Sequence, residues 1–187
     1  MHVGIGSKCR YDWISRGWQG CSGELFNSMR AMDFLSSLPE VDSDRIGVTG
    51  TSGGGTLSFL MAVADRRVAA AASCCGIPTP YYTLANREFL MHCDCMLVQT
   101  LFQRDTSEFA ALVAPRPLLF CYGDQDAMFC HDEYSGMVEK ARRVYRLYGC
   151  EDNCQLYEYK GPHGYIPESV TRINQWFDKH LAGEPRP

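Results

Sequence analysis

The segment that most constrains this chain is the glycine-rich motif GTSGG at residues 50–54, which joins two apolar runs. The β-branched residues of 46–49 before it are typical of a strand, and the run 56–64 after it is typical of a helix. The glycines remove the Cβ atoms that would collide in a sharp turn. The segment therefore predicts a strand, a tight turn with Ser52 at its centre, and a helix.

The spacing GxSxG gives Ser52 the surroundings of a nucleophile. A serine on such a turn is exposed above the end of its strand, and the N–H of Gly53, at the start of the helix, points to where an oxyanion would form. Two other interpretations are a turn that only packs tightly and a phosphate-binding loop. The phosphate-binding spacings GxxxxGK[ST] and GxGxxG are both absent from the sequence.

Strands and helices are predicted to alternate along the rest of the chain. Further strands are predicted at 68–75, 117–122 and 155–159, and further helices at 24–38, 132–147 and 167–181. This alternation predicts an α/β fold with a mostly parallel sheet flanked by helices. With 187 residues of which 45% are hydrophobic, the chain is expected to form one domain, 1–187, that begins with an irregular segment, 1–22.

Three candidate catalytic side chains follow predicted strands, in the order Ser52, Asp126, His163. Functional groups of an open parallel sheet gather at the carboxyl ends of its strands. His163 would take the proton from Ser52 and later give it to a leaving alcohol, while Asp126 would fix the tautomer of His163. Asp124 is an alternative to Asp126, and either carboxylate could instead brace the loop. His163 could also be a turn histidine.

Charge and hydropathy exclude several classes of partner. The net charge is −4, and the chain has no basic cluster that would indicate nucleic-acid binding or a membrane surface. No apolar stretch approaches the ~20 residues that a transmembrane helix needs. The first ten residues are too polar for a signal peptide, which favours a cytoplasmic location. We expect no cofactor.

Ten cysteines are present, without the paired CxxC blocks of a zinc ribbon. Cys74, Cys75 and Cys121 lie in apolar runs, where free cysteine behaves as a small hydrophobic residue. Cys150 and Cys154 flank a polar loop and could form a disulfide in an oxidising compartment.

The sequence HCDC at residues 92–95 contains three kinds of metal ligand. Four consecutive side chains cannot easily all face one ion, and no second cluster completes a tetrahedral site. We therefore expect no metal here, and favour a packed pocket wall or a disulfide.

Four segments resemble the α/β-hydrolase superfamily and, within it, the acetyl xylan esterase-like members: RAMDFLSSLPEVDSDRIGVTGTSGGG, LVAPRPLLFCYGDQDAMF, GPHGY and INQWFDKHL. The order serine, aspartate, histidine is also that of α/β-hydrolases. The resemblance covers residues 24–182. It implies a serine carboxylesterase that hydrolyses short-chain, acetyl-type esters, with acetylated carbohydrate as substrate class, through an acyl-enzyme on Ser52, with Asp126 and His163 completing the triad.

The sequence departs from this superfamily before the nucleophile strand. The superfamily's sheet has about four strands there, and one of their loops supplies the second oxyanion amide. Here 44 residues precede Arg45, and they predict an irregular segment and one helix. We therefore expect a truncated α/β-hydrolase fold whose nucleophile strand lies at a sheet edge. A second copy in a homodimer is expected to cover this edge; alternatively, the rest of a longer chain completes the fold.

Two other functions fit the same motifs. One is a serine peptidase of the prolyl-peptidase type, because that class shares the scaffold and the triad. The other is a truncated, inactive hydrolase that acts as a binding or assembly module, which the short N-terminal part favours.

Overall fold

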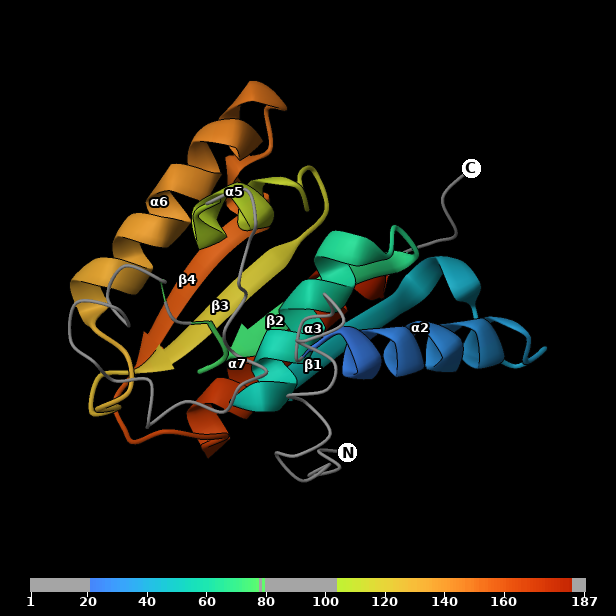
Figure 1. The fold of residues 1–187 in the computed structure, drawn as a ribbon, viewed down its shortest axis with the longest axis horizontal. Coiled ribbons are helices and arrows are strands. Elements are labelled where there is room, and N and C mark those ends of the chain that lie inside the picture. Colours follow the sequence, from blue (N-terminus) through green and yellow to red (C-terminus); the bar gives the residue numbers. More distant parts are fainter. Residues whose placement is uncertain (1–20, 78, 80–103, 183–187) are drawn as a thin grey trace, which may run out of the picture.

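The computed structural model describes residues 21–77, 79 and 104–182 (Figure 1). Their four strands form one sheet in which every neighbouring pair is parallel, in the order β1-β2-β3-β4. The strands are β1 (Ile46–Thr51), β2 (Val68–Cys74), β3 (Leu118–Gly123) and β4 (Cys154–Tyr159). The predicted α/β class with a parallel sheet is confirmed.

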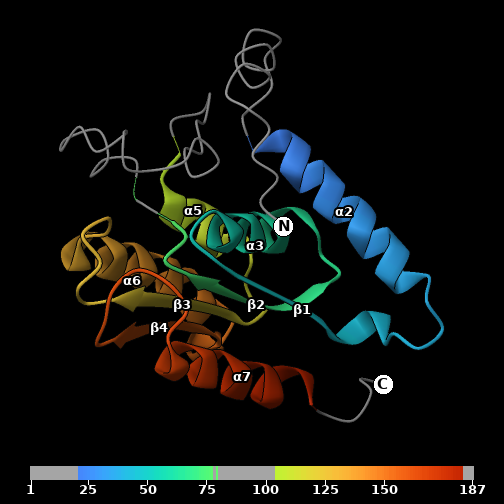
Figure 2. The same cartoon turned by 90° about the horizontal axis from the view of Figure 1, so that it is seen from below.

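Helices cover both faces of the sheet. Figure 2 shows α3 and α5 on one side and α7 on the other, while α6 packs beside α5 and along β4. The helices are α2 (Ser22–Ser36), α3 (Gly53–Ala64), α5 (Thr106–Ala111), α6 (His131–Leu147) and α7 (Pro167–Leu181), with short 3-10 turns η1 (Ser43–Arg45) and η4 (Glu151–Asn153). No helix in these ranges is long and apolar enough to cross a membrane.

The small residues of β2 let helices approach the sheet closely from both sides. All seven residues of β2 are buried, and four of them are the consecutive alanines 69–72. On one face the buried Trp176 of α7 donates a hydrogen bond from Nε1 to the Ala71 carbonyl, at 3.2 Å. On the other, Phe59 of α3 packs on Phe120 of β3, with ring centroids 5.8 Å apart. These contacts attach α7 and α3 to opposite faces of the sheet.

The register of the strands aligns their carboxyl ends. Thr51 pairs with Cys74, and Cys74 pairs in turn with Cys121. Gly123, the last residue of β3, pairs with Tyr159, the last residue of β4. The loops that leave these four strands therefore all lie at the carboxyl-terminal end of the sheet.

Among the described strands, β1 has one neighbour, β2, as expected for a nucleophile strand at a sheet edge. The helix before it, α2, packs against α3. Arg67 holds the two together through ion pairs with Asp33 of α2, at 2.7 Å, and with Asp65, directly after α3, at 2.5 Å. Met32 is the buried residue of α2, whereas Phe34 is 64% exposed.

One expectation about packing is wrong, and the two cysteines that could form a disulfide are not bridged. The pattern of α7 predicts Val170 in the core together with Ile173 and Trp176, but Val170 is 40% exposed. On the first turn of α7 the buried residue is Ser169, which faces the core with Ile173 and Trp176. Cys150 and Cys154 are free thiols. Cys154 is buried in β4, so its side chain belongs to the core and not to the polar loop.

Candidate functional site

The turn between β1 and α3 is concentrated at Ser52. β1 continues to Thr51 and α3 begins at Gly53, so the turn is shorter than the five residues expected. Ser52 has φ 56° and ψ −126°, a conformation that residues with a side chain rarely adopt. Its N–H donates to the Cys74 carbonyl at 2.9 Å, which fixes it to the end of β2. Backbone strain of this kind is concentrated at functional sites.

The two outer glycines of the motif have different roles. A Cβ on Gly50 would lie 2.2 Å from the carbonyl oxygen of Gly54, so Gly50 has to be glycine for the helix to start so close to the strand. A Cβ on Gly54 would meet no described atom within 4 Å other than those of its chain neighbours and its own helix backbone. The expectation that each glycine prevents a collision is therefore wrong for Gly54.

Among the described residues, the N–H of Gly53 has no hydrogen-bond partner. Helical hydrogen bonds begin with the Thr56 N–H, which donates to the Ser52 carbonyl at 3.0 Å. The N–H groups of the first turn have no carbonyl partner inside the helix, and the helix dipole adds partial positive charge there. Gly53 thus offers a hydrogen-bond donor next to the Ser52 hydroxyl.

Asp126 and His163 are in direct contact. His163 Nδ1 lies 2.7 Å from Asp126 Oδ2, while Asp126 Oδ1 accepts from the Met128 N–H at 3.0 Å. The Asp126 side chain is 1% exposed and that of His163 is 29% exposed. The ring of Phe129 lies parallel to the imidazole, with centroids 6.0 Å apart. With Nδ1 as the donor to Asp126, a neutral His163 has its free lone pair on Nε2.

Asp124 has a different partner. Its Oδ1 accepts from the Gly161 N–H at 2.9 Å, so it braces the loop that follows β4. Of the two carboxylates that the sequence offers, Asp126 is the one that contacts His163.

The third candidate, Ser52, also lies at the carboxyl-terminal end of the sheet. It follows β1, while Asp126 follows β3 and His163 follows β4. Within the ranges that the structure describes, the Ser52 hydroxyl and the His163 ring share no hydrogen bond. Catalytic hydrogen bonds are often long without substrate and shorten in the reacting complex. Serine hydrolysis uses these three kinds of side chain: a serine hydroxyl, a histidine and a carboxylate that orients the histidine.

Sequence reasoning missed Cys75, which lies directly after β2. Cys75 is not part of the strand; it has φ 46° and is fully buried. Its Sγ lies 3.0 Å from the Tyr159 hydroxyl. Sγ of Cys75, a carboxylate oxygen of Asp126 and a ring nitrogen of His163 all lie within 4.8 Å of one another. The available signal was its position just past a strand end, like that of Ser52.

The electrostatic environment separates Cys75 from its neighbour. A hydrogen bond with the Cys74 thiol lowers the pKa of Cys75, and the Tyr159 hydroxyl lowers it further. The same contact with Cys75, together with burial, raises the pKa of Cys74. Of these two adjacent thiols, Cys75 is therefore the one that ionises more easily.

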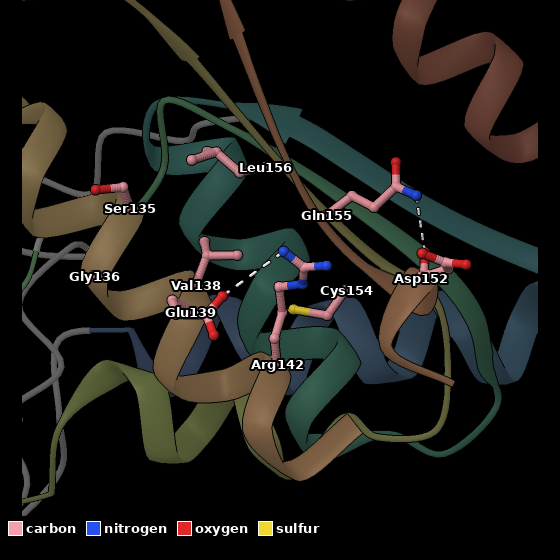
Figure 3. Close-up of a pocket in the computed structure, with 9 residues that line it drawn as sticks. All are labelled: Ser135, Gly136, Val138, Glu139, Arg142, Asp152, Cys154, Gln155 and Leu156. Carbon is pink, nitrogen blue, oxygen red and sulfur yellow. Dashed lines mark hydrogen bonds and ion pairs between the residues drawn. The ribbon is translucent and has the colours of Figure 1, made fainter. Parts of the chain in front are cut away.

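The open hollow in Figure 3 lies between α6 and the first half of β4, with a volume of about 590 Å³. Its lining residues are Ser135, Gly136, Val138, Glu139, Arg142, Asp152, Cys154, Gln155 and Leu156. His163 follows the opposite end of β4. The hollow is therefore separate from the carboxyl-terminal end of the sheet, where Ser52 lies.

Two features of the sequence lie outside the described residues. They are the HCDC segment, 92–95, and most of the irregular segment expected at 1–22. The expectation that 92–95 holds no metal stays a prediction.

Residues 10–165 match the model of the dienelactone hydrolase family. The putative hydrolase YtaP of Bacillus subtilis (strain 168) is 26% identical over 149 residues, which cover 79% of this chain and 49% of that protein. The chain therefore spans about half the length of this curated relative.

Solved structures of esterases share the fold. A glucuronoyl esterase from Sporotrichum thermophile superimposes with a TM-score of 0.73 at 19% identity, over 98% of this chain and 59% of that one. The methylesterase BT1017 gives 0.68 at 24% identity, over 86% and 35%. The narrower resemblance to acetyl xylan esterase-like members stays a prediction. The family match covers most of the sequence and agrees with the parallel sheet and the strained Ser52 turn: the chain belongs to the dienelactone hydrolase family, in the α/β-hydrolase superfamily.

Proposed function

We propose that this chain carries the catalytic residues of a serine ester hydrolase. The observation that carries the proposal is that the strained Ser52 and the His163–Asp126 pair all follow strands at the carboxyl-terminal end of the sheet. A serine hydroxyl becomes a useful nucleophile when a neighbouring base can take its proton. His163, with Nδ1 engaged by Asp126, has Nε2 available for that role.

In the proposed reaction, Ser52 Oγ attacks the ester carbonyl carbon while His163 Nε2 accepts its proton. The Gly53 N–H donates to the carbonyl oxygen as it becomes negative. The tetrahedral species then releases the alcohol, which receives the proton from His163, and leaves an acyl group on Ser52. Water, deprotonated by His163, hydrolyses this acyl-enzyme. The buried Asp126 carboxylate stabilises the imidazolium in both steps.

The proposed substrates are short-chain, acetyl-type esters, including esters of carbohydrates. A small acyl group suits a site at which Phe129 stacks on His163. The similar solved structures also include a glucuronoyl esterase and a methylesterase, and both names denote ester hydrolysis. A panel of p-nitrophenyl acetate, longer p-nitrophenyl esters, acetylated xylan and methyl glucuronate would rank these classes.

The first test is fluorophosphonate labelling and p-nitrophenyl acetate turnover of the wild type, Ser52→Ala and the matched control Ser37→Ala, whose hydroxyl is exposed on the C-terminal side of α2. We expect labelling and turnover in the wild type and the control, and neither in Ser52→Ala. Turnover that survives in Ser52→Ala would contradict the proposal. Hydrolysis of aminoacyl amides but not esters would favour the peptidase, and a wild type without labelling would favour a binding module.

We also propose that two copies associate across β1, because this strand has a neighbour on one side only among the described strands. An unpaired strand edge is a template for further pairing. Light scattering after size-exclusion chromatography should then give twice the chain mass of 21.0 kDa. A monomer would overturn this association and favour completion of the sheet by other parts of a longer chain.

A further inference from the structure

Cys75 brings a third kind of ligand to the Asp126–His163 pair. Its Sγ and one ligand atom from each of the other two lie within 4.8 Å of one another. The hydrolysis described above uses the carboxylate and the imidazole but has no role for the thiol. The position of the thiol is nevertheless well defined, because the Cys75 N–H donates to the Cys121 carbonyl at 2.8 Å and Sγ contacts the Tyr159 hydroxyl.

A thiolate, an imidazole and a carboxylate together form a ligand set for zinc. Zn²⁺ takes Cys, His and Asp ligands, and sites with three protein ligands leave one position open. Its bond lengths of about 2.0–2.3 Å place the ligand atoms of a tetrahedral site about 3.5 Å apart. The ligand atoms of the three residues lie within 4.8 Å of one another, so small side-chain movements would bring them to this spacing. The part-exposed His163 ring lies on the solvent side of the cluster. The thiolate favours soft or borderline cations over Mg²⁺ or Ca²⁺.

We propose that Cys75, Asp126 and His163 bind a thiophilic divalent cation such as Zn²⁺, and that this binding reversibly switches off ester hydrolysis at Ser52. The site itself follows from the cluster, whereas the inhibition rests on the proposed function.

Inhibition follows whichever ring nitrogen of His163 binds the cation. If Nε2 is the ligand, its lone pair is no longer available for the Ser52 proton. If Nδ1 is the ligand, its hydrogen bond to Asp126 is lost and the ring proton moves to Nε2, which then cannot accept another. In both cases the cation also occupies the Asp126 carboxylate, and binding releases the Cys75 thiol proton to solvent.

Metal binding is tested directly on the chelator-treated full chain. Zn²⁺ is titrated by calorimetry, and Co²⁺ is used as a spectroscopic probe because a thiolate ligand gives a near-ultraviolet charge-transfer band. The variant is Cys75→Ser, which keeps the size of the side chain and its contact with Tyr159 but supplies a poor zinc ligand. The control is Cys150→Ser, because Cys150 is a part-exposed free thiol beside η4, at the other end of the sheet.

We expect the wild type and Cys150→Ser each to bind one equivalent of Zn²⁺. Cys75→Ser should bind this equivalent at least about 100-fold more weakly, because removing a metal ligand costs more affinity than removing a residue that only supports a ligand. The Co²⁺–thiolate band should be lost to the same extent. Equal binding by wild type and Cys75→Ser would overturn the site. If Cys75→Ser does not fold, His163→Gln replaces it in the binding assays, with the same two outcomes.

Turnover of p-nitrophenyl acetate separates the two proposals. We expect Zn²⁺ to inhibit the wild type and a chelator to restore its turnover. The turnover of Cys75→Ser, measured relative to its own metal-free rate, should be insensitive to Zn²⁺. An active wild type that Zn²⁺ does not inhibit would overturn the switch and leave the esterase intact. A wild type that binds the cation through Cys75 but has no turnover would support the site and contradict the proposed function.

Discussion

Gly123 lies against Gly161, so that a Cβ on Gly123 would be 2.3 Å from the Gly161 carbonyl oxygen. The same carbonyl accepts from the Gln125 N–H at 3.1 Å, and the Gly161 N–H donates to Asp124. The loop that carries Asp126 is thus held to the loop that carries His163 by backbone contacts. The distance between these two side chains is set by the backbone, and not by their own hydrogen bond alone.

The Gly123→Ala substitution should separate the two loops. Inserting a methyl group into this contact is expected to destabilise the fold by about 1–3 kcal/mol and to lower kcat for ester hydrolysis by about tenfold or more, because small misplacements are expensive in catalysis. Urea unfolding and steady-state kinetics measure both effects. Gly136→Ala is the control, because a Cβ there meets no atom of the described residues and helix α6 gains a better helix former. Equal behaviour of the two variants would contradict the role of this contact.

Alanine should also have different effects on stability at two glycines of the GTSGG motif, Gly50 and Gly54. Gly50→Ala is expected to destabilise the chain by about 1–3 kcal/mol, because the new methyl group meets the Gly54 backbone. Gly54→Ala is expected to leave stability unchanged or to raise it by up to about 1 kcal/mol, since a helical position with free space gains from alanine. Thermal unfolding of the two variants gives the comparison. A more stable Gly50→Ala would show that the turn can open without cost.

Asp126→Asn should reduce kcat for esters by about 10³- to 10⁴-fold with little change in KM, because an amide cannot stabilise the imidazolium and favours the wrong tautomer. Asp124→Asn retains an oxygen acceptor for the Gly161 N–H and should stay within about threefold of the wild type, given that no proton transfer involves it. The pair distinguishes an orienting carboxylate from a bracing one. Similar losses in both variants would show that loop structure, and not charge, is what matters.

His131 should titrate above its ordinary value of 6.5, because its hydrogen bond with Glu158 raises its pKa. Hydrogen bonds from Tyr134 and then His131 lower the pKa of Glu158 below 4.5. The pair therefore stabilises the fold between these two ordinary values, loses its effect as the pH rises through the raised pKa of His131, and loses it again as the pH falls through the lowered pKa of Glu158.

Proton NMR titration of His131 in the wild type and in Glu158→Gln checks this pairing. The pKa should fall toward 6.5 in the variant. An unchanged value would assign the shift to another neighbour.

The positions of Ser52, Asp126 and His163 could be predicted because each follows a strand, and strand periodicity is legible in a single sequence. The choice between Asp126 and Asp124 could not be settled, since it depends on which side of the loop faces His163. The helix α5 was not predicted, although Asp105 and Glu108 form a capping box that marks its start. Its short length gives too little periodicity to recognise.

The role of Cys75 shows where sequence reasoning stops. An apolar run that ends in two cysteines predicts a buried strand, and β2 does end at Cys74. The next residue adopts a positive φ, which reverses the direction of its side chain and places its thiol near His163 and Asp126. That conformation is imposed by tertiary contacts with β3 and β4, for which residue order gives no signal.

The position of β1 in the sheet also bears on how Ser52 keeps its geometry, because β1 has a single neighbour among the described strands. Amides of an edge strand exchange with solvent through small local openings, whereas those of β2 and β3, paired on both sides, require larger ones. Ser52 directly follows β1, which, like β4, is paired on one side only among the described strands. A local opening of β1 would therefore displace Ser52 without unfolding the rest of the sheet. Any chain that pairs with β1 would make such openings rarer without touching the substrate.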